Sequence, residues 1–389
     1  MDDRLPMPQP CDLIDGNRGL TDLIDRLYEH EIVAVDTESD SYHAYAPKVC
    51  LFQFSTSSED ALLDPLGDID LGPLGDFFRD PKIEKVFHAA ENDIGMLGHQ
   101  YGFEFHNIFD TMLASQILGY ARCGLATLLE THFNVKMTKK WQTSNWAKRP
   151  LLPEQIEYAT LDTHYLLPLR DRLSDELHQR GTMEEAQSEF ERVSAIQWSP
   201  RPFDPEGFSR LRESRHLDPI ELRRLQELYL LRDRLARDRN WAPYRIFPDG
   251  AMVELARLGP KGLVDLEKVK ALKSWKIKSM GPEIVEAIER ARRAGPLELA
   301  KNRPRAARSA FSPSERRRIE VLKRWRDIEA EERDVPKERV LTSGLIHQIS
   351  RLSPPSRESL LEVDGMTPWR VNEFGIAILD ALAKADDEE

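Results

Sequence analysis

An apolar run over residues 32–35 leads directly into two acids, Asp36 and Glu38. The run predicts a β-strand. Side chains of a strand alternate between its two faces, so Asp36 and Glu38 project from the same face. The fold must therefore bring two acids to one place, and this restricts what the rest of the chain builds around them.

Three further residues extend this acidic group along the chain. Asp93 follows a predicted strand over 85–88 and stands where the next helix is expected to begin. Tyr158 and Asp162 are four residues apart, which places them on one face of a helix. Three separate elements therefore direct four carboxylates and one phenol to a single point.

Four carboxylates that converge in this way need cations between them. Two carboxylates ~4 Å apart repel by roughly 4 kcal/mol at an effective dielectric constant of 20. Carboxylate oxygens suit Mg²⁺ or Mn²⁺, and the sequence has no Cys/His cluster that would favour zinc. Two such ions ~3.5–4 Å apart clamp the attacking water and the leaving oxygen at a phosphorus atom. The phenol of Tyr158 would orient that water or deprotonate it.

Each of these patterns has a structural alternative when it is taken singly. An Asp-x-Glu after a strand is usually a solvated turn or a helix N-cap, and a Tyr-x-x-x-Asp pair is common on helices. The order of all five residues is much less expected by chance. The residues alone therefore predict metal-assisted phosphodiester hydrolysis.

The neighbours of the five residues carry a resemblance to a known family. The segments that carry it are Val35-Asp36-Thr37-Glu38, His88-Ala89-Ala90-Glu91-Asn92-Asp93, Phe109-Asp110-Thr111, Gln142-Thr143-Ser144-Asn145-Trp146, Arg149-Pro150-Leu151 and Tyr158-Ala159-Thr160-Leu161-Asp162. Over residues 10–195 the chain resembles ribonuclease D, in the tyrosine-bearing branch of the DEDD 3′→5′ exonucleases.

The resemblance implies a role for each matching residue. It implies that two divalent cations, Mg²⁺ or Mn²⁺, are bound by the four acids Asp36, Glu38, Asp93 and Asp162. It also implies that Tyr158 positions the attacking water. In one departure from the pattern, Asn145 precedes Trp146 where many relatives have Asp. Asn145 is not among the four ligands, so the expected catalytic group is unchanged.

Other residues in the N-terminal half are candidates for RNA contact. His88 either reaches the substrate or serves as a core histidine at the end of a strand. Gln142, Thr143 and Trp146 either line the terminal nucleotide by stacking and hydrogen bonds or form a packed loop over the site. Asp110 is predicted to be the N-cap of a helix over 111–118, which is a structural role.

The charge of the chain is divided unevenly along its length. The whole chain carries −12, which would argue against a polyanionic ligand. Residues 1–200 carry −17, residues 201–310 carry +9 and residues 311–389 carry −4. The acidic part holds the predicted metal site, and the middle part is the candidate for binding nucleic acid.

Two proline-rich stretches mark the domain boundaries, and a repeat follows the first of them. At an offset of 94 residues, positions 223–287 align with 317–381 without a gap, and 18 of the 65 pairs are identical. Both copies have a helical pattern and resemble the HRDC module that follows the nuclease domain in ribonuclease D. The predicted boundaries are an exonuclease domain 1–200, a linker 201–214, a first HRDC domain 215–295, a linker 296–314, a second HRDC domain 315–385 and a tail 386–389.

The two copies differ in a run of basic residues. The first copy carries Lys268, Lys270, Lys273, Lys276 and Lys278, and only the position of Lys276 is also basic in the second, as Arg370. The run predicts salt-sensitive contacts to RNA phosphates, and its alternative is a solvated helical face. The second copy is predicted to be a spacer or a wall beside the substrate.

The N-terminal domain is predicted to be an α/β domain with a mixed sheet flanked by helices. Its expected strands cover 32–35, 49–55, 61–63, 85–88 and 104–109, and the first three form a meander. The resemblance implies a ribonuclease H-like fold. We therefore expect this exonuclease domain to be followed by two all-α HRDC domains.

Composition and segment patterns restrict the setting of the protein. No apolar run approaches ~18 residues, so no membrane span is expected. The start Met1-Asp2-Asp3 lacks the pattern of a signal peptide. The three cysteines are scattered, which disfavours disulfides and fits a reducing cytoplasm.

The expected function is metal-dependent 3′→5′ exoribonuclease activity that releases nucleoside 5′-monophosphates. The resemblance implies this direction and these products, and it implies trimming of 3′ ends of tRNA precursors and other small stable RNAs. The expected partner is RNA with an accessible 3′ end, and no protein partner is inferred. One alternative is a 3′→5′ DNA exonuclease, because the sequence does not locate contacts to a 2′-hydroxyl. The other is a catalytically idle RNA-binding adaptor, although the presence of all five site residues counts against it.

Overall fold

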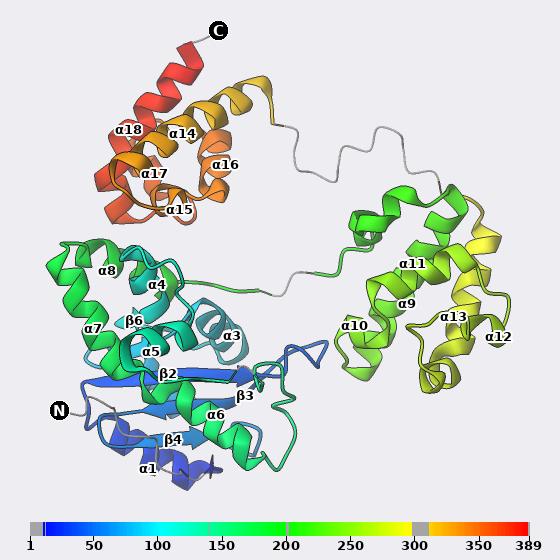
Figure 1. Cartoon of the computed structure of the whole chain (residues 1–389), viewed down its shortest axis with the longest axis horizontal. Helices are drawn as coiled ribbons and strands as arrows, with labels where there is room; N and C mark the ends of the chain where they lie inside the picture. The colour runs from blue at the N-terminus through cyan, green and yellow to red at the C-terminus, as the bar shows by residue number, and fades with distance from the viewer. Residues whose placement is uncertain (1–10, 12, 139, 200–201, 298–310, 388–389) are drawn as a thin grey trace. The chain divides into compact units, whose positions relative to one another are not determined.

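The computed structural model describes most of the chain, and the described residues form two compact units (Figure 1). The described residues are 11, 13–138, 140–199, 202–297 and 311–387. The first unit takes its residues from Met1–Ser39, Val49–Ser199 and Phe311–Glu389. The second unit takes its residues from Asp40–Lys48 and Pro200–Ala310.

A six-stranded mixed sheet forms the centre of the N-terminal domain. The strands are β1 (Leu13–Ile14), β2 (Ile32–Ser39), β3 (Val49–Ser55), β4 (Asp60–Leu63), β5 (Glu84–Phe87) and β6 (Ile108–Asp110). Their order is β1-β4-β3-β2-β5-β6. The neighbours β2, β3 and β4 are antiparallel, whereas the β2–β5, β5–β6 and β1–β4 pairs are parallel. The predicted mixed sheet and its meander are confirmed, and β2 lies in the interior of the sheet.

Helices cover both faces of this sheet. They are α1 (Asn17–Leu27), α2 (Gly72–Arg79), α3 (Glu91–Tyr101), α4 (Thr111–Ile117), α5 (Leu125–Phe133), α6 (Pro153–His164), α7 (Leu166–Gln179) and α8 (Met183–Ser194). On one face, Leu51 of β3 belongs to the same buried cluster as Tyr158 of α6. On the other face, the ring of Phe54 packs edge-to-face against Phe77 of α2, with centroids 6.2 Å apart.

Several strand boundaries differ from those predicted. β2 continues to Ser39 because its antiparallel ladder with β3 extends past the apolar run. β5 ends at Phe87, so His88 lies outside the strand. β6 begins four residues later than predicted, after Asn107, whose φ of 52° interrupts extended backbone. β1 has only two residues, which is too short to show a periodic pattern.

Asp110 is the N-cap of α4, as predicted. Its carboxylate accepts hydrogen bonds from the backbone N–H groups of Met112 at 2.8 Å and Leu113 at 3.1 Å. The same carboxylate also accepts from the N–H groups of Ala89 at 3.1 Å and Ala90 at 2.8 Å. Asp110 therefore joins the start of α4 to the turn that precedes α3.

Two helical domains repeat one order of elements. The first comprises α9 (Pro219–Arg239), α10 (Pro243–Ile246), α11 (Asp249–Leu258), α12 (Leu263–Leu266) and α13 (Ser274–Ala294). The second comprises α14 (Pro313–Glu332), α15 (Lys337–Val340), α16 (Ser343–Leu352), α17 (Arg357–Leu361) and α18 (Pro368–Asp387). At the 94-residue offset, α10 and α11 coincide with α15 and α16 residue for residue. Ile284 and its counterpart Ile378 are both fully buried, each in the core of its own domain.

Part of the predicted first linker is folded. Two short 3₁₀ helices, η1 (Gly207–Arg210) and η2 (Arg212–His216), precede α9. Phe208 is fully buried in the core of the first helical domain, so the chain joins that core before α9 begins. Residues 298–310 of the second predicted linker and 388–389 of the predicted tail lie outside the described residues.

The segment Asp40–Lys48, which follows β2, packs with the first helical domain in the second unit. The hydroxyl of Tyr45 donates to Asp233 at 2.7 Å. The backbone N–H groups of Tyr45 and Ala46 both donate to the side-chain oxygen of Asn240. This association could not be predicted from the sequence, because the bonded residues are nearly 200 positions apart.

The longest helices are α9 and α13, with 21 residues each. Both carry many charged residues, because only one side of each helix packs into the core. None of the helices in the described parts of the chain is long and apolar enough to cross a membrane.

Candidate active site

The strand β2 presents Asp36 and Glu38 on the face of the sheet that α6 covers. In the β2–β3 register Asp36 lies opposite Gln53 and Glu38 lies opposite Leu51. Leu51 packs in the cluster that contains Tyr158 of α6, which identifies this face. Both acids are partly accessible to solvent, so the group they begin is open to a ligand.

Asp93 reaches the same site from the first turn of α3. The hydroxyl of Thr37, which lies between the two acids of β2, donates a hydrogen bond to the carboxylate of Asp93. The N-terminus of a helix favours a negative charge, so this position also suits an ionised acid. One hydrogen bond thus holds the α3 acid beside the β2 acids.

Helix α6 supplies Tyr158 and Asp162 from one face. Pro153 begins the helix at a position where a missing N–H has no cost, and the side chain of Gln155 accepts a bond from the N–H of Leu152 at 3.0 Å. The phenol of Tyr158 donates a hydrogen bond to the carboxylate of Asp162. Both side chains are buried, with exposed fractions of 6% and 9%.

The charges of the four acids act on one another. Burial raises the pKa of Asp36 well above its usual range, and the charges of Asp93, Asp162 and Glu38 raise it further. Burial raises the pKa of Glu38 to about 9, with a further contribution from Asp162 and Asp93. Burial raises the pKa of Asp162 to about 7, against the lowering effect of the bond from Tyr158. Burial raises the pKa of Asp93 to about 6, against the bond from Thr37.

Tyr158 is affected by the same charges. Burial raises the pKa of its phenol well above the ordinary value, and the charges of Asp162, Glu38 and Asp36 add to this rise. The phenol therefore keeps its proton at neutral pH and acts as a hydrogen-bond donor. Of the two roles expected for Tyr158, orienting a water fits this environment better than deprotonating it.

The donor set fits divalent cations. No described Lys, Arg or His forms an ion pair with any of the four acids. Within the described parts of the chain no group of three His, Cys, Asp or Glu side chains forms a ready-made metal cage. Acids that repel one another are expected to stay apart until cations draw them together. The charge of the group, rather than a preformed geometry, is the feature that calls for hard cations.

Gln53 indicates that this face takes up a further polar group. Its side chain is fully buried opposite Asp36, and neither its amide nitrogen nor its oxygen has a hydrogen-bond partner among the described residues. A buried polar group without a partner costs about 1–3 kcal/mol. A water or a hydrated ion beside Asp36 would satisfy it.

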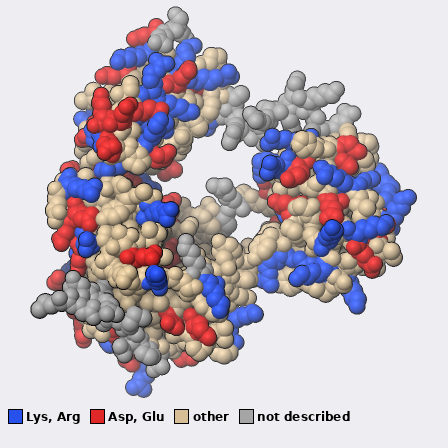
Figure 2. Space-filling model, in the orientation of Figure 1, with Lys and Arg blue, Asp and Glu red and all other residues tan. Residues whose placement is uncertain are grey.

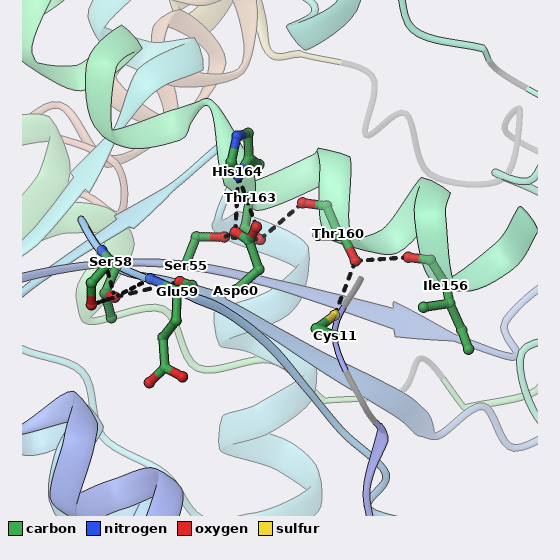
Figure 3. Close-up of polar contacts among 10 residues, drawn as sticks. Cys11, Ser55, Ser58, Glu59, Asp60, Ile156, Thr160, Thr163 and His164 are labelled. Carbon is green, nitrogen blue, oxygen red and sulfur yellow. Dashed lines mark hydrogen bonds and ion pairs between the residues drawn. The ribbon is translucent and has the colours of Figure 1, made fainter. Parts of the chain in front are cut away.

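A network of buried polar groups fixes the C-terminal half of α6 on the sheet (Figure 3). The imidazole of His164 lies 2.8 Å from the carboxylate of Asp60, at the start of β4. The hydroxyl of Ser55 in β3 donates to Asp60 at 2.6 Å and lies 2.7 Å from the hydroxyl of Thr163. Asp162 immediately precedes Thr163 and His164, so the network determines where this acid is held. This network could not be predicted from the sequence, since Asp60 and His164 are 104 residues apart.

The other predicted contact residues have different surroundings. Burial lowers the pKa of His88 to about 4, and its Nδ1 lies 2.9 Å from the hydroxyl of Thr111. This neutral, bonded imidazole fits the structural alternative. Trp146 is fully buried with its ring 6.1 Å from that of Tyr158, so it does not present a face for stacking. Gln142 and Thr143 are exposed on the loop before α6.

The five lysines of the basic run in the first helical domain have different surroundings. The ammonium group of Lys276 donates to the backbone carbonyls of Arg245 at 2.6 Å and Ile246 at 2.9 Å, at the end of α10. These two bonds hold the ammonium group of Lys276 at the end of α10. Lys268 forms an ion pair with Asp265 at 2.8 Å. The remaining three, Lys270, Lys273 and Lys278, are exposed.

Comparisons with known proteins agree with this architecture. Residues 11–178 match the family model described as 3′-5′ exonuclease, and residues 221–288 and 315–382 each match the HRDC domain. The chain is 33% identical over 300 residues to a ribonuclease D from Zymomonas mobilis subsp. mobilis, covering 75% of this chain and 76% of that protein. The chain belongs to the ribonuclease D family. The resemblance inferred from the sequence motifs and the predicted fold class are both confirmed.

Two similarities extend beyond bacterial ribonuclease D. The chain is 34% identical over 260 residues to exosome complex component 10 of Mus musculus, covering 65% of this chain. The match spans only 29% of the length of that relative. The crystal structure of the catalytic core of RRP6 from Trypanosoma brucei superposes with a TM-score of 0.68 at 27% identity, covering 74% of this chain and 80% of the other.

Replacing Glu38 by Gln should stabilise this ribonuclease D family member when no metal is bound. The pKa of Glu38 is raised to about 9 from 4.5, so the native state binds more protons than the unfolded state between these values. The wild type therefore loses stability as pH rises through this range. In EDTA the melting temperature of Glu38→Gln should exceed that of wild type at pH 8, and the difference should shrink by pH 4. Roughly 2–4 °C is expected for each kcal/mol gained. Equal melting temperatures at pH 8 would show that neither burial nor the neighbouring acids disfavour the charged form of Glu38.

Replacing Asp60 by Asn should slow hydrolysis without preventing folding. The change weakens the tie to His164, so α6 holds Asp162 less accurately. Since a misplacement of ~1 Å costs roughly 10²-fold in rate, kcat should fall by roughly 10- to 100-fold with a smaller change in KM. The control Ser58→Ala alters an exposed hydroxyl on the same turn and should behave as wild type. A normal kcat in folded Asp60→Asn would remove the network from catalysis.

Proposed function

We propose that this protein is a metal-dependent 3′→5′ exoribonuclease that releases nucleoside 5′-monophosphates. The observation that carries the proposal is a group of four acids, brought from three elements, whose pKa values are all raised and which no described cation neutralises. Membership of the ribonuclease D family supplies the direction of attack and the class of substrate. Asp36, Glu38, Asp93 and Asp162 are the proposed metal ligands, and Tyr158 is the proposed positioning group for water.

Two divalent ions, Mg²⁺ or Mn²⁺, would supply at this site the positive charge that activates water and stabilises the leaving oxygen. Water adds to phosphorus, the bond from phosphorus to the 3′ oxygen breaks, and the proton ends on the new 3′-hydroxyl. The phenolic oxygen of Tyr158, whose proton is donated to Asp162, accepts a hydrogen bond from the attacking water and so fixes its orientation. Asp162 lies next to the polar network that includes His164. It holds Tyr158 in place through the hydrogen bond between the two side chains.

The proposed substrate is RNA with a free single-stranded 3′ end, including precursors of tRNA and other small stable RNAs. Support comes from the ribonuclease D relatives over most of this chain and from exosome complex component 10 over part of it. The region 201–310 carries a net charge of +9, and on the face in Figure 2 Lys and Arg side chains gather over the domain of α9–α13. Lys270, Lys273 and Lys278 are its proposed phosphate contacts.

A time course on 5′-labelled RNA with a single-stranded 3′ tail tests the proposal. With Mg²⁺ or Mn²⁺ the label should pass through a ladder shortening from the 3′ end, and chromatography should show nucleoside 5′-monophosphates. EDTA or Asp36→Ala should abolish the ladder, because the first loses the cations and the second loses a ligand. The control Glu91→Ala removes an exposed acid two residues from Asp93 and should stay active.

Intact RNA under every metal would contradict the proposal and favour an RNA-binding adaptor. A ladder on a matched DNA strand but not on RNA would change the substrate class to DNA.

Tyr158→Phe should retain folding and metal binding and lose most of the rate. Only the phenolic oxygen is removed, and a positioned group of this kind typically contributes ~10²–10⁴-fold. Single-turnover kinetics at saturating enzyme would isolate the hydrolytic step from RNA binding. Tyr28→Phe, at an exposed tyrosine after α1, serves as the control. Wild-type turnover in Tyr158→Phe would remove the phenol from the mechanism.

A further inference from the structure

Aromatic and basic side chains gather on one surface of the second unit. This surface, the aromatic platform, consists of Tyr42, Trp241, Tyr244, Arg245, Trp275 and Lys276. Tyr42, Tyr244 and Trp275 are 53%, 52% and 48% exposed, which is unusual for large rings. The platform combines the segment after β2 with α10 and the start of α13.

Hydrogen bonds and ring contacts connect members of the platform. The hydroxyl of Tyr244 donates to the backbone carbonyl of Tyr42 at 2.7 Å. The rings of Trp241 and Trp275 pack edge-to-face with centroids 6.1 Å apart. The guanidinium of Arg245 lies 5.5 Å from the centroid of Trp241, and the ammonium of Lys276 lies 5.6 Å from that of Trp275. These contacts hold Tyr244 beside the segment of Tyr42, and they hold Trp241, Trp275 and the two cations together.

In the parts of the chain that the structure describes, the cations of the platform have no acidic partner. Among the described residues, Arg245 and Lys276 form no ion pair, and their hydrogen bonds go to the segment after β2 and to backbone carbonyls. Burial lowers the pKa of Lys276, and the nearby charges of Lys273 and Arg245 lower it further. An anion at this surface would relieve the repulsion among these three cations.

The second helical domain provides an internal comparison. At the 94-residue offset, Arg245 and Lys276 correspond to Arg339 and Arg370. Arg339 forms an ion pair with Glu185 of α8 at 2.5 Å, and Arg370 forms one with Glu189 of α8 at 2.6 Å. In the second copy this surface is thus covered by the acids of a helix.

The rings also distinguish the two copies. Trp369, the counterpart of Trp275, donates its backbone N–H to Ser188 of α8 at 3.3 Å. The counterparts of Trp241 and Tyr244 are Val335 and Glu338, which have no aromatic ring. The first copy therefore keeps the cationic positions, lacks the acidic partner and adds two rings.

We propose that the aromatic platform binds a single-stranded segment of RNA, with bases stacked on Tyr42, Tyr244 and Trp275 and phosphates held near Arg245. Rings interleaved with cations suit a ligand that alternates flat bases with negative charges. Stacking on rings requires unpaired bases, so the platform selects single strands over duplexes. This inference rests on the proposed function only in taking RNA as the ligand, and it does not involve the four acids.

Binding of a fluorescein-labelled 12-nucleotide oligoadenylate to the full chain tests the proposal. The assay contains EDTA, which separates binding from hydrolysis. Tyr244→Ala and Trp275→Leu should each weaken binding by roughly 5- to 150-fold, since a stacked base is lost with each ring. Arg245→Gln should reduce the salt dependence of the dissociation constant by about one unit of log–log slope.

Three controls give the test its specificity. Tyr244→Phe keeps the ring and should bind as wild type, while Glu338→Ala changes the equivalent exposed position of the second copy and should have no effect. A blunt RNA duplex should bind the wild type and the ring variants equally. Tyr42→Ala, at a half-exposed ring, provides a further variant if Trp275→Leu unfolds.

The outcomes separate this proposal from the proposed function. Wild-type affinity for oligoadenylate in folded Tyr244→Ala and Tyr42→Ala would overturn the platform and favour a protein partner for the same rings, even if RNA is hydrolysed. Weaker binding in the ring variants would support the platform even if no RNA is hydrolysed under any metal. Equal losses of affinity for the duplex and for the single strand in the ring variants would also overturn the proposal, because base stacking would then not be the cause.

Discussion

Repulsion among the four acids of the site is the constraint on which the rest of the exonuclease domain depends. Asp36 and Glu38 are side by side on an interior strand, and Asp93 and Asp162 are brought to them by two helices. Each acid is disfavoured in its charged form, by burial first and by its neighbours second. Such a group opposes folding at neutral pH unless cations bind, so the surrounding structure must supply enough stability to hold it. The large apolar cores on both faces of the sheet meet that need.

Asp93 and Asp162 are positioned by polar contacts that the apolar core does not provide. Thr37 bonds Asp93, and Asp110 joins the turn before α3 to the start of α4. Asp60 and its partners fix the end of α6, which carries Asp162. Hydrogen bonds have defined directions, whereas apolar packing does not, so these contacts set the positions of the acids more closely than burial alone. Variants of these supporting residues are therefore expected to change the rate more than they change the fold.

The sequence predicted those parts of the site that depend on local geometry. The period of two in a strand predicted that Asp36 and Glu38 share one face of β2. The spacing of four predicted that Tyr158 and Asp162 share one face of α6. The N-cap role of Asp110 also depends only on neighbouring residues. Contacts between distant residues could not be predicted in this way. The bond between Asp60 and His164 and the unsatisfied side chain of Gln53 depend on strand register and helix packing. The burial of Trp146 and the carbonyl partners of Lys276 could not be predicted either, because side-chain type alone does not reveal them.

The two helical domains share their helices and core positions but differ in their surface residues. The two copies keep the same helices and equivalent core residues, so their folding requires only the apolar pattern. Their surfaces have diverged at positions that the core does not restrict, as at Tyr244 and Glu338. Arg339 and Arg370 meet the acids of α8, whereas Arg245 and Lys276 meet none among the described residues. Two copies of one fold can thus take different partners when a few surface residues change, because the partner is chosen by charge and exposed rings rather than by the helices beneath them.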